Sequence, residues 1–282
     1  MKKICYILLT CMLALAACDK NDEESVTPGN ISDISYIAKP GSIVLKWTVP
    51  ADSDYQYVKV TYYDPWMNKN NVLLSSVYSD SLAIPNMLRK FGDYTFNLQT
   101  VSRTGELGNA QTINASALAR PEEYTIASSS PIALTASMLS TNAQEPSEGP
   151  IENLLDGSTT TFFHSSWSST IWPAYIQIDL DAPVNAFSFW YRNRANANGK
   201  PSIIEIYGSN DAANFTLLET INSGLPAGSG AEYTSPVIIT APQSYSHIRL
   251  LVTKTAANNT FFNMAELKLY KCDLTIYNPE GE

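Results

Sequence analysis

Residues 151–172, with the sequence IENLLDGSTTTFFHSSWSSTIW, concentrate the chemistry of this chain. They contain an Asp-Gly turn followed by four hydroxyl side chains in succession, one of the two histidines and two of the five tryptophans. An aspartate beside hydroxyl groups on a turn supplies the hard oxygen ligands that Ca²⁺ prefers. A histidine three residues before a tryptophan places a hydrogen-bonding ring near a flat apolar ring, and this combination suits a sugar. Both interpretations depend on residues much further along the chain.

The sequence after this stretch predicts β-strands. Ile176, Ile178 and Leu180 alternate with polar or half-polar neighbours, and this period of two is typical of a strand with one buried face. The same alternation recurs at residues 187–189, 204–206, 248–252 and 267–269. Turn residues separate the runs and no longer stretch has a helical period, so we expect a β-sandwich or jelly roll of about 140 residues.

A series of short motifs follows in a fixed order along this half of the chain. The series is Leu155-Asp156-Gly157, Thr161, His164, Trp167, Pro173, Ile178-Asp179-Leu180, Ser209-Asn210-Asp211, Ile248-Arg249-Leu250 and Ala265-Glu266-Leu267. In this order it resembles the discoidin domain, also called the coagulation factor type C domain, over about residues 128–271. The pairing of His164 with Trp167 resembles the family 32 carbohydrate-binding modules in particular. The chain departs from the family at Ala212, where glycine is common, and at Phe163, where tryptophan is common.

The resemblance implies a structural Ca²⁺ site that does not touch a ligand. The expected ligands are Asn153, Asp156, Ser158, Thr161, Ala265 and Glu266, of which Asn153, Ala265 and Glu266 rest on the resemblance alone. Carboxylate, hydroxyl and carbonyl oxygens from a flexible loop are the donors that Ca²⁺ accepts. In the alternative interpretation, Asp156 is a turn residue bonded to its own backbone and Glu266 is a surface carboxylate.

The resemblance also implies a site for galactose-type sugars on loops at one end of the sandwich, where family members use a His, an Arg, an Asn and an aromatic residue. The matching residues are His164, Trp167, Arg194, Asn198, Phe261 and Phe262. The loop before Asn198 is shorter than in the family, so Arg192 is an alternative to Arg194. Adjacent side chains of an extended segment point to opposite sides, so we expect one of the two phenylalanines to face inward. Packing in the core is the alternative role for the histidine and the tryptophan.

The first half of the chain also predicts short strands, about seven of them over roughly ninety residues. They include residues 41–50, 57–63 and 94–101. An early tryptophan, Trp47, and a tyrosine at the start of a late strand, Tyr94, resemble the core tryptophan and the corner tyrosine of a fibronectin type III domain. Trp66 lies in a loop, where it either forms an exposed contact or, as we expect, folds back over the sheet.

The N-terminal residues predict an exported lipoprotein. Two lysines precede an apolar run from Ile4 to Ala17 that is too short to cross a bilayer and fits a signal peptide. The run ends in Leu15-Ala16-Ala17-Cys18, which resembles a bacterial lipobox with Cys18 as the lipidated residue. The acidic segment after it resembles the tag of outer-membrane lipoproteins that face the cell exterior. Without the first three cysteines, Cys272 has no partner for a disulfide.

Composition restricts the function. Asp and Glu number 27 against 18 Lys and Arg, so nucleic acid is not an expected partner because phosphate binding needs a basic surface. The chain has two histidines, no motif of an activated nucleophile and no recognisable carboxylate pair, so we expect no enzyme activity. The expected function is non-catalytic carbohydrate binding at the cell surface. The alternatives are a protein-binding scaffold and a lipid-binding domain with Phe261 and Phe262 as an apolar loop tip.

We therefore expect an all-β chain in which an immunoglobulin-like (fibronectin type III) sandwich precedes a discoidin-like β-sandwich or jelly roll. The expected segments are a lipoprotein signal peptide at residues 1–17, a polar tether at 18–28, the fibronectin type III-like domain at 29–120, the discoidin-like domain at 125–272 and a C-terminal tail at 273–282.

Overall fold

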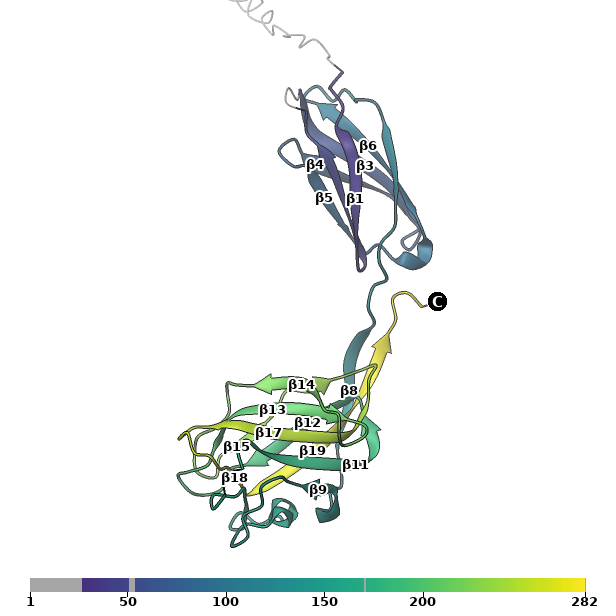
Figure 1. Ribbon diagram of the computed structural model, residues 1–282. Helices are drawn as coiled ribbons and strands as arrows, with labels where there is room; N and C mark the ends of the chain where they lie inside the picture. The colour runs from purple at the N-terminus through teal and green to yellow at the C-terminus, as the bar shows by residue number, and fades with distance from the viewer. Residues whose placement is uncertain (1–26, 51–53, 170, 282) are drawn as a thin grey trace, which may run out of the picture. The chain divides into compact units, whose positions relative to one another are not determined.

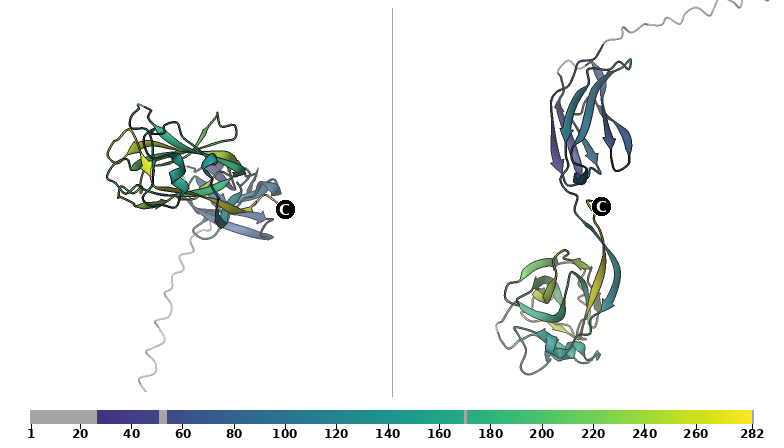
Figure 2. Two further views of the ribbon diagram at one scale, coloured as in Figure 1. Left: turned by 90° about the horizontal axis from the view of Figure 1, so that it is seen from below. Right: turned by 90° about the vertical axis from the view of Figure 1, so that its right-hand side faces the viewer.

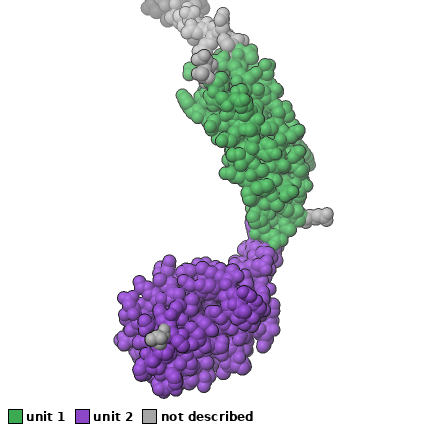
Figure 3. All heavy atoms as spheres, in the orientation of Figure 1, with its two compact units in different colours: residues 1–122, 278–282 green, residues 123–277 purple. Residues whose placement is uncertain are grey.

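A computed structural model describes residues 27–50, 54–169 and 171–281 of the chain (Figure 1). It consists of two compact units (Figure 3). The first contains the described residues up to Glu122 together with residues 278–281, and the second is Glu123–Tyr277. Both units are built from antiparallel strands, which confirms the predicted all-β class. The predicted signal peptide and Cys18 lie outside the described residues.

The first unit contains seven strands in two sheets. The elements are β1 (Ser32–Lys39), β2 (Ser42–Thr48), β3 (Tyr55–Asp64), β4 (Lys69–Ser76), β5 (Ser81–Pro85), η1 (Arg89–Phe91), β6 (Tyr94–Ser102) and β7 (Gln111–Ala115). One sheet has the order β1-β2-β5 and the other β4-β3-β6-β7. Alternate residues, such as Ile43, Leu45 and Trp47 on β2, are buried between the sheets. The number of strands agrees with the prediction of about seven, while the assignment to the fibronectin type III domains stays a prediction.

Two residues singled out in the sequence have defined positions in this unit. The hydroxyl of Tyr94 accepts a hydrogen bond from Leu88 N and donates one to Leu88 O, both at 3.0 Å, as a corner tyrosine does. The turn after β3 is fixed by Asp64, whose carboxylate accepts the amide of Trp66 at 2.9 Å. Trp66 itself is 44% exposed. It is not part of the buried core of this unit.

The second unit is a β-sandwich. Its elements are β8 (Glu123–Pro131), η2 (Ala136–Met138), β9 (Leu139–Ser140), η3 (Ile151–Leu155), β10 (Phe163–His164), β11 (Ala174–Val184), β12 (Ala186–Arg192), β13 (Pro201–Ser209), β14 (Thr216–Ile221), β15 (Glu232–Thr234), β16 (Ile238–Ile239), β17 (Tyr245–Thr255), β18 (Asn263–Met264) and β19 (Glu266–Tyr277). The sheets have the orders β14-β13-β17-β11-β9 and β15-β12-β19-β8, with β16 also on β12 and a separate pair β10-β18. Figure 2 shows the strands of this unit from two further directions. Apolar residues of both large sheets share one core.

The last strand extends further than the sequence predicted. β19 continues to Tyr277, and Leu274 to Tyr277 pair with β8, so the first half of the expected tail is sheet. The reason is that β8 begins already at Glu123 and offers these residues a partner. After β19 the chain joins the first unit, where the carboxylate of Glu280 accepts backbone amides of Arg89, Lys90 and Arg120 at 2.8–3.1 Å.

Cys272 is buried on β19 as a free cysteine. Among the described residues, no helix has the length and apolar character that a membrane span requires.

Replacing Tyr94 by Phe should destabilise the first unit. The change leaves the buried amide of Leu88 without an acceptor, which costs about 1–3 kcal/mol of unfolding free energy. Denaturant unfolding followed by fluorescence would measure it. Tyr78→Phe is the matched control, since Tyr78 is 96% exposed and its hydroxyl should contribute nothing. Equal denaturation midpoints for the two variants would show that the hydroxyl of Tyr94 does not stabilise the first unit.

Candidate functional site

A two-residue strand pairing brings the segment around His164 beside the segment that follows Phe261 and Phe262. Phe163 pairs with Met264 and His164 with Asn263 across β10 and β18. Phe163 and Phe262 are both fully buried, with ring centroids 5.5 Å apart in an edge-to-face contact. Because side chains alternate along extended backbone, His164 and Phe261 lie on the other side, and their ring centroids are 5.1 Å apart. Phe261 is therefore the phenylalanine that faces this loop end, and Phe262 belongs to the core.

The ring of His164 has a fixed tautomer. It is 4% exposed, and Nδ1 lies 2.7 Å from the carbonyl oxygen of Ser165. A carbonyl can only accept, so Nδ1 donates this bond and carries the proton. In the neutral imidazole the other nitrogen, Nε2, is then an acceptor. His164 can thus accept a hydrogen bond from a hydroxyl group that reaches it.

Arg194, from the loop after β12, lies in the same cluster. Its guanidinium carbon is 3.3 Å from the centroid of the Phe162 ring, a close cation–π stack. Its Nη2 is 3.8 Å from a carboxylate oxygen of Glu148. Glu148 also accepts a hydrogen bond from the indole Nε1 of Trp167 at 3.2 Å, and Trp167 is 52% exposed. One carboxylate therefore connects the predicted arginine to the predicted tryptophan at the surface.

A buried carboxylate, Glu145, shapes the loop that carries Trp167. It accepts the backbone amides of Trp167 and Ser168 at 3.2 Å and the hydroxyl of Ser147 at 2.8 Å. Burial opposes its charge, but the hydrogen bonds from Ser147 and Ser168 outweigh burial and lower the pKa of Glu145 to about 2. Glu145 is thus a fixed anion that positions the loop.

The other predicted residues occupy different positions. Asn198 is exposed, and its carbonyl accepts Nδ2 of Asn263 at 3.2 Å, so its loop rests against β18. Next to it, Gly199 has a φ of +70°, and a Cβ there would lie 2.4 Å from Nδ2 of Asn263. Glycine is therefore required by both the backbone and the close approach. Arg192 instead pairs with Glu232 at 3.2 Å on the outer face of the sheet, so Arg194 is the arginine of the cluster.

The predicted metal ligands converge around two carboxyl groups. Asp156 accepts the amide of Ser158 at 2.8 Å, and the hydroxyl of Thr161 donates to the carbonyl of Ser158 at 3.2 Å. Glu266 is 7% exposed, and its Oε1 has no hydrogen-bond partner among the described residues. Burial, followed by the charge of Asp156, raises the pKa of Glu266 to about 7. A buried oxygen without a partner beside a second carboxylate fits a bound cation.

The remaining ligands would be neutral oxygens. Within the described ranges, no three His, Cys, Asp or Glu side chains form a metal-sized group, so an ion here would depend on hydroxyl and carbonyl oxygens as well, which suits Ca²⁺ rather than a transition metal. Asn153 is on η3 and Ala265 immediately precedes β19, two elements in contact with each other. An ion held by both would fasten the start of the unit to its end.

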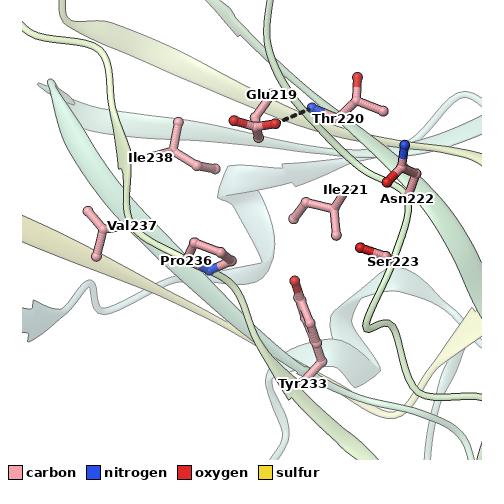
Figure 4. A pocket seen from close by; sticks show the side chains of 9 residues that line it. All are labelled: Glu219, Thr220, Ile221, Asn222, Ser223, Tyr233, Pro236, Val237 and Ile238. Atoms are coloured by element: carbon pink, nitrogen blue, oxygen red, sulfur yellow. Dashed lines mark hydrogen bonds between the residues drawn. The ribbon is translucent and has the colours of Figure 1, made fainter.

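A separate hollow of about 300 Å³ lies between β14 and the β15–β16 segment (Figure 4). Ile221, Pro236 and Ile238 form apolar walls, and the hydroxyl of Tyr233 points between them. None of the predicted sugar or metal residues lines it. It is therefore distinct from the loop cluster.

Sequence reasoning missed four residues of the cluster, namely Glu145, Glu148, Phe162 and Lys200. Glu145 and Glu148 precede residues 151–172 in a polar segment. This segment has no periodicity from which a structural role could be predicted. Phe162 could have been recognised, because it follows the same alternation that places Phe163 in the core. The buried position of Lys200 could not be predicted, because lysines are mostly exposed and a lysine before a proline usually lies in a turn.

Comparison with known proteins gives two family matches. Residues 126–267 match the model of the F5/8 type C domain, and residues 28–116 match a domain of unknown function, DUF4959. No curated protein matches the chain.

Several solved structures are similar to parts of the chain. A family 32 carbohydrate-binding module from Clostridium perfringens, in complex with GalNAc-β-1,3-galactose, is 22% identical, covers 50% of this chain and 99% of its own, and has a TM-score of 0.41. The family 32 module of NanJ from C. perfringens, in complex with galactose, is 21% identical over 51% of this chain and 99% of its own, with a TM-score of 0.40. A SusE-like protein is 15% identical over 85% of this chain and 96% of its own, with a TM-score of 0.39.

We propose that Ca²⁺ binds between Asp156 and Glu266. A ligand that binds only the folded state at a hundredfold excess over its Kd adds about 2.7 kcal/mol of stability. For a unit of this size we expect Ca²⁺ to raise Tm by roughly 5–10 °C relative to chelator. Calorimetric melts would measure the shift. Asp156→Asn should abolish the response, while Asp181→Asn, at an exposed position of β11, should keep it. Identical melts with Ca²⁺ and chelator would exclude the ion.

Proposed function

We propose that this chain, which belongs to the F5/8 type C domain family, binds a galactose-type sugar at its loop cluster without cleaving it. The observation that carries the proposal is the link through Glu148, which holds the exposed indole of Trp167 and the guanidinium of Arg194 beside each other. Sugars are recognised by a flat aromatic surface against the apolar side of the ring and by planar polar groups at the hydroxyls. The cluster supplies both.

The hydrogen-bonding roles are complementary. The guanidinium of Arg194 donates, and its stack on Phe162 fixes its plane. Nε2 of His164 accepts, because its other nitrogen is bonded to Ser165. A sugar hydroxyl both donates and accepts, so one hydroxyl between these two groups would satisfy both. The axial hydroxyl of galactose projects from the ring and can reach such a position. Asn198, exposed on the adjoining loop, would contact a neighbouring hydroxyl.

The carboxylates of the cluster favour binding over hydrolysis. Glycosidases use a pair of carboxyl groups, of which one is an acid with a raised pKa. Glu145 has a lowered pKa and its oxygens are already bonded to the loop. Glu148 is engaged by Arg194 and Trp167. Neither is placed as a proton donor, which supports a non-catalytic role.

The expected affinity is weak. A hydrogen bond to a charged group contributes about 1.5–3 kcal/mol, and covering about 50 Å² of apolar sugar surface adds about 1 kcal/mol. Association costs several kcal/mol, so the Kd should be roughly millimolar to tens of micromolar. Many copies on one surface would compensate through avidity. A lipid-binding loop tip is less well supported, because Phe262 is buried and Phe261 packs on His164.

We further propose that the chain is a lipoprotein of the outer membrane, displayed outside the cell. The support is the sequence Leu15-Ala16-Ala17-Cys18 and the acidic residues after it. The anchor would keep the sugar site at the cell surface, where multivalent binding is possible.

Substitution of the two arginines tests the sugar site. Arg194→Ala should lower the affinity for galactose about ten- to hundredfold, because it removes a charged hydrogen bond. Arg192→Ala should leave it unchanged, since Arg192 is paired with Glu232 elsewhere. Titration calorimetry with galactose, N-acetylgalactosamine and glucose would measure both, with glucose expected to bind least. No heat with the first two sugars at millimolar concentration would refute sugar binding.

Changing Cys18 to Ala should release the protein from the membrane fraction, because the residue that would carry the lipid is lost. Cell fractionation and immunoblotting would show the shift. Cys11→Ala, within the expected signal peptide, is the control and should remain in the membrane fraction. A Cys18→Ala protein that still sediments with membranes would place the anchor elsewhere.

A further inference from the structure

Lys200, the residue before β13, is buried although it carries an ammonium group. Its side chain is 1% exposed, and lysines are almost never fully buried without a charged partner. No carboxylate among the described residues forms an ion pair with it. Burying an unpaired charge is costly, so its partners must offset that cost.

The partners are three oxygens from two segments. The ammonium donates to the carbonyl of Arg194 at 2.5 Å, to Oδ1 of Asn196 at 2.5 Å and to Oδ1 of Asn263 at 3.4 Å. Three donors thus meet three acceptors, which matches the capacity of a lysine. Arg194 and Asn196 are on the loop after β12, whereas Asn263 is on β18 opposite His164. Lys200 therefore ties the arginine loop to the strand that pairs with the histidine.

The same loop is closed by further bonds to these segments. The amide of Asn263 donates to the carbonyl of Gly199 at 3.0 Å, and the amide of Gly199 donates to Oδ1 of Asn259 at 3.1 Å. These bonds fix the end of the loop at Gly199. The start of the loop is bonded to the segment before β15, where the amide of Asn193 donates to the carbonyl of Ala231 at 2.8 Å and the amide of Gly230 donates to the carbonyl of Arg194 at 3.3 Å. The ammonium adds the bond that connects this start to β18.

A packing role alone does not explain a lysine here. An apolar side chain of similar length would fill the space without burying a charge, and such replacements are often neutral or stabilising. What the apolar side chain cannot supply is donors for the carbonyl of Arg194 and Oδ1 of Asn196. Without them, the carbonyl of Arg194 keeps only the amides of Asn196 and Gly230, at 2.8 and 3.3 Å. Oδ1 of Asn196 would need water, and this part of the loop would lose its connection to Asn263 through the ammonium.

We propose that Lys200 is a positioning residue of the sugar site, which holds the backbone of Arg194 so that its guanidinium stays stacked on Phe162. This inference rests on the proposed sugar binding. Lys200 does not touch the sugar, and its effect reaches the ligand through Arg194.

The hydrogen bonds that Lys200 donates depend on the protonation of its amino group. Burial, followed by the charge of Arg194, lowers the pKa of Lys200 to about 8. The groups that face the ammonium are this guanidinium, itself paired with Glu148, and the uncharged side chains of Asn196 and Asn263. As the pH rises through about 8, the lysine loses a proton and one of its three donors. Sugar affinity should therefore fall between pH 7 and pH 9.5.

Lys200→Met tests whether the hydrogen bonds of Lys200 hold the loop. Lys254→Met, at an exposed lysine, is the matched control. Amide hydrogen exchange without sugar should become at least about tenfold faster at residues 193–199 in Lys200→Met, because the loop opens more often. Calorimetry with galactose should show affinity about tenfold below wild type at pH 7 and little further change at pH 9.5. Wild type and Lys254→Met should both weaken across that pH range.

The outcomes separate the two proposals. Unchanged hydrogen exchange at residues 193–199 would refute the claim that Lys200 holds this loop, whether or not sugar binds. Faster exchange with unchanged galactose affinity would overturn the positioning role. A wild-type chain that binds no sugar at any pH would refute the proposed function and, with it, the positioning role. If Lys200→Met does not fold, Asn196→Ala removes one acceptor on the loop, and the same two measurements decide.

Discussion

The edge-to-face contact between Phe163 and Phe262 determines the arrangement of the loop end. Both rings are fully buried, so each fixes the orientation of a short extended segment in the core. Period-two alternation then leaves Phe162, His164 and Phe261 no other side to occupy. Arg194 stacks on the first of these three, and the ring of the third packs on the histidine. A hydrophobic contact in the interior thus sets the positions of polar groups at the surface.

The strands could be predicted because alternation records which face is buried. Ile176, Ile178 and the other inward residues of β11 and β17 are recognised in this way. Trp47 and Tyr94 of the first unit were singled out by their resemblance to fibronectin type III residues, and both are buried. Strand ends were less predictable, as β19 shows, because a few polar residues join a strand only when a partner is available. The loop residues escaped prediction where their role depends on long-range contacts. Glu148 acquires its role from Arg194 and Trp167, and neither is near it in sequence.

In the second unit, hydrogen bonds of buried polar groups connect segments that a disulfide could otherwise have linked. Cys272 is unpaired, and the loops are instead fixed by Glu145 and Lys200, each of which is bonded to backbone or amide groups of another segment. A buried polar group destabilises the fold when some of its hydrogen bonds are missing, and it specifies one arrangement of its neighbours when all of them are formed. The carboxylate of Glu145 and the ammonium of Lys200 thus add to the backbone hydrogen bonds that hold the loops.

The return of the chain to its first unit has a consequence for biosynthesis. Glu280 accepts the amide of Arg120 across 160 residues of sequence, so the second unit is an insertion within the first. On a ribosome that adds about 5–20 residues per second, roughly 8–32 s separate the synthesis of these two residues. During that interval the carboxylate of Glu280 is not yet available to the amides of Arg89, Lys90 and Arg120, and β19, which completes the second unit, is synthesised only just before Glu280. The earlier half of the polypeptide is thus the later one to be completed.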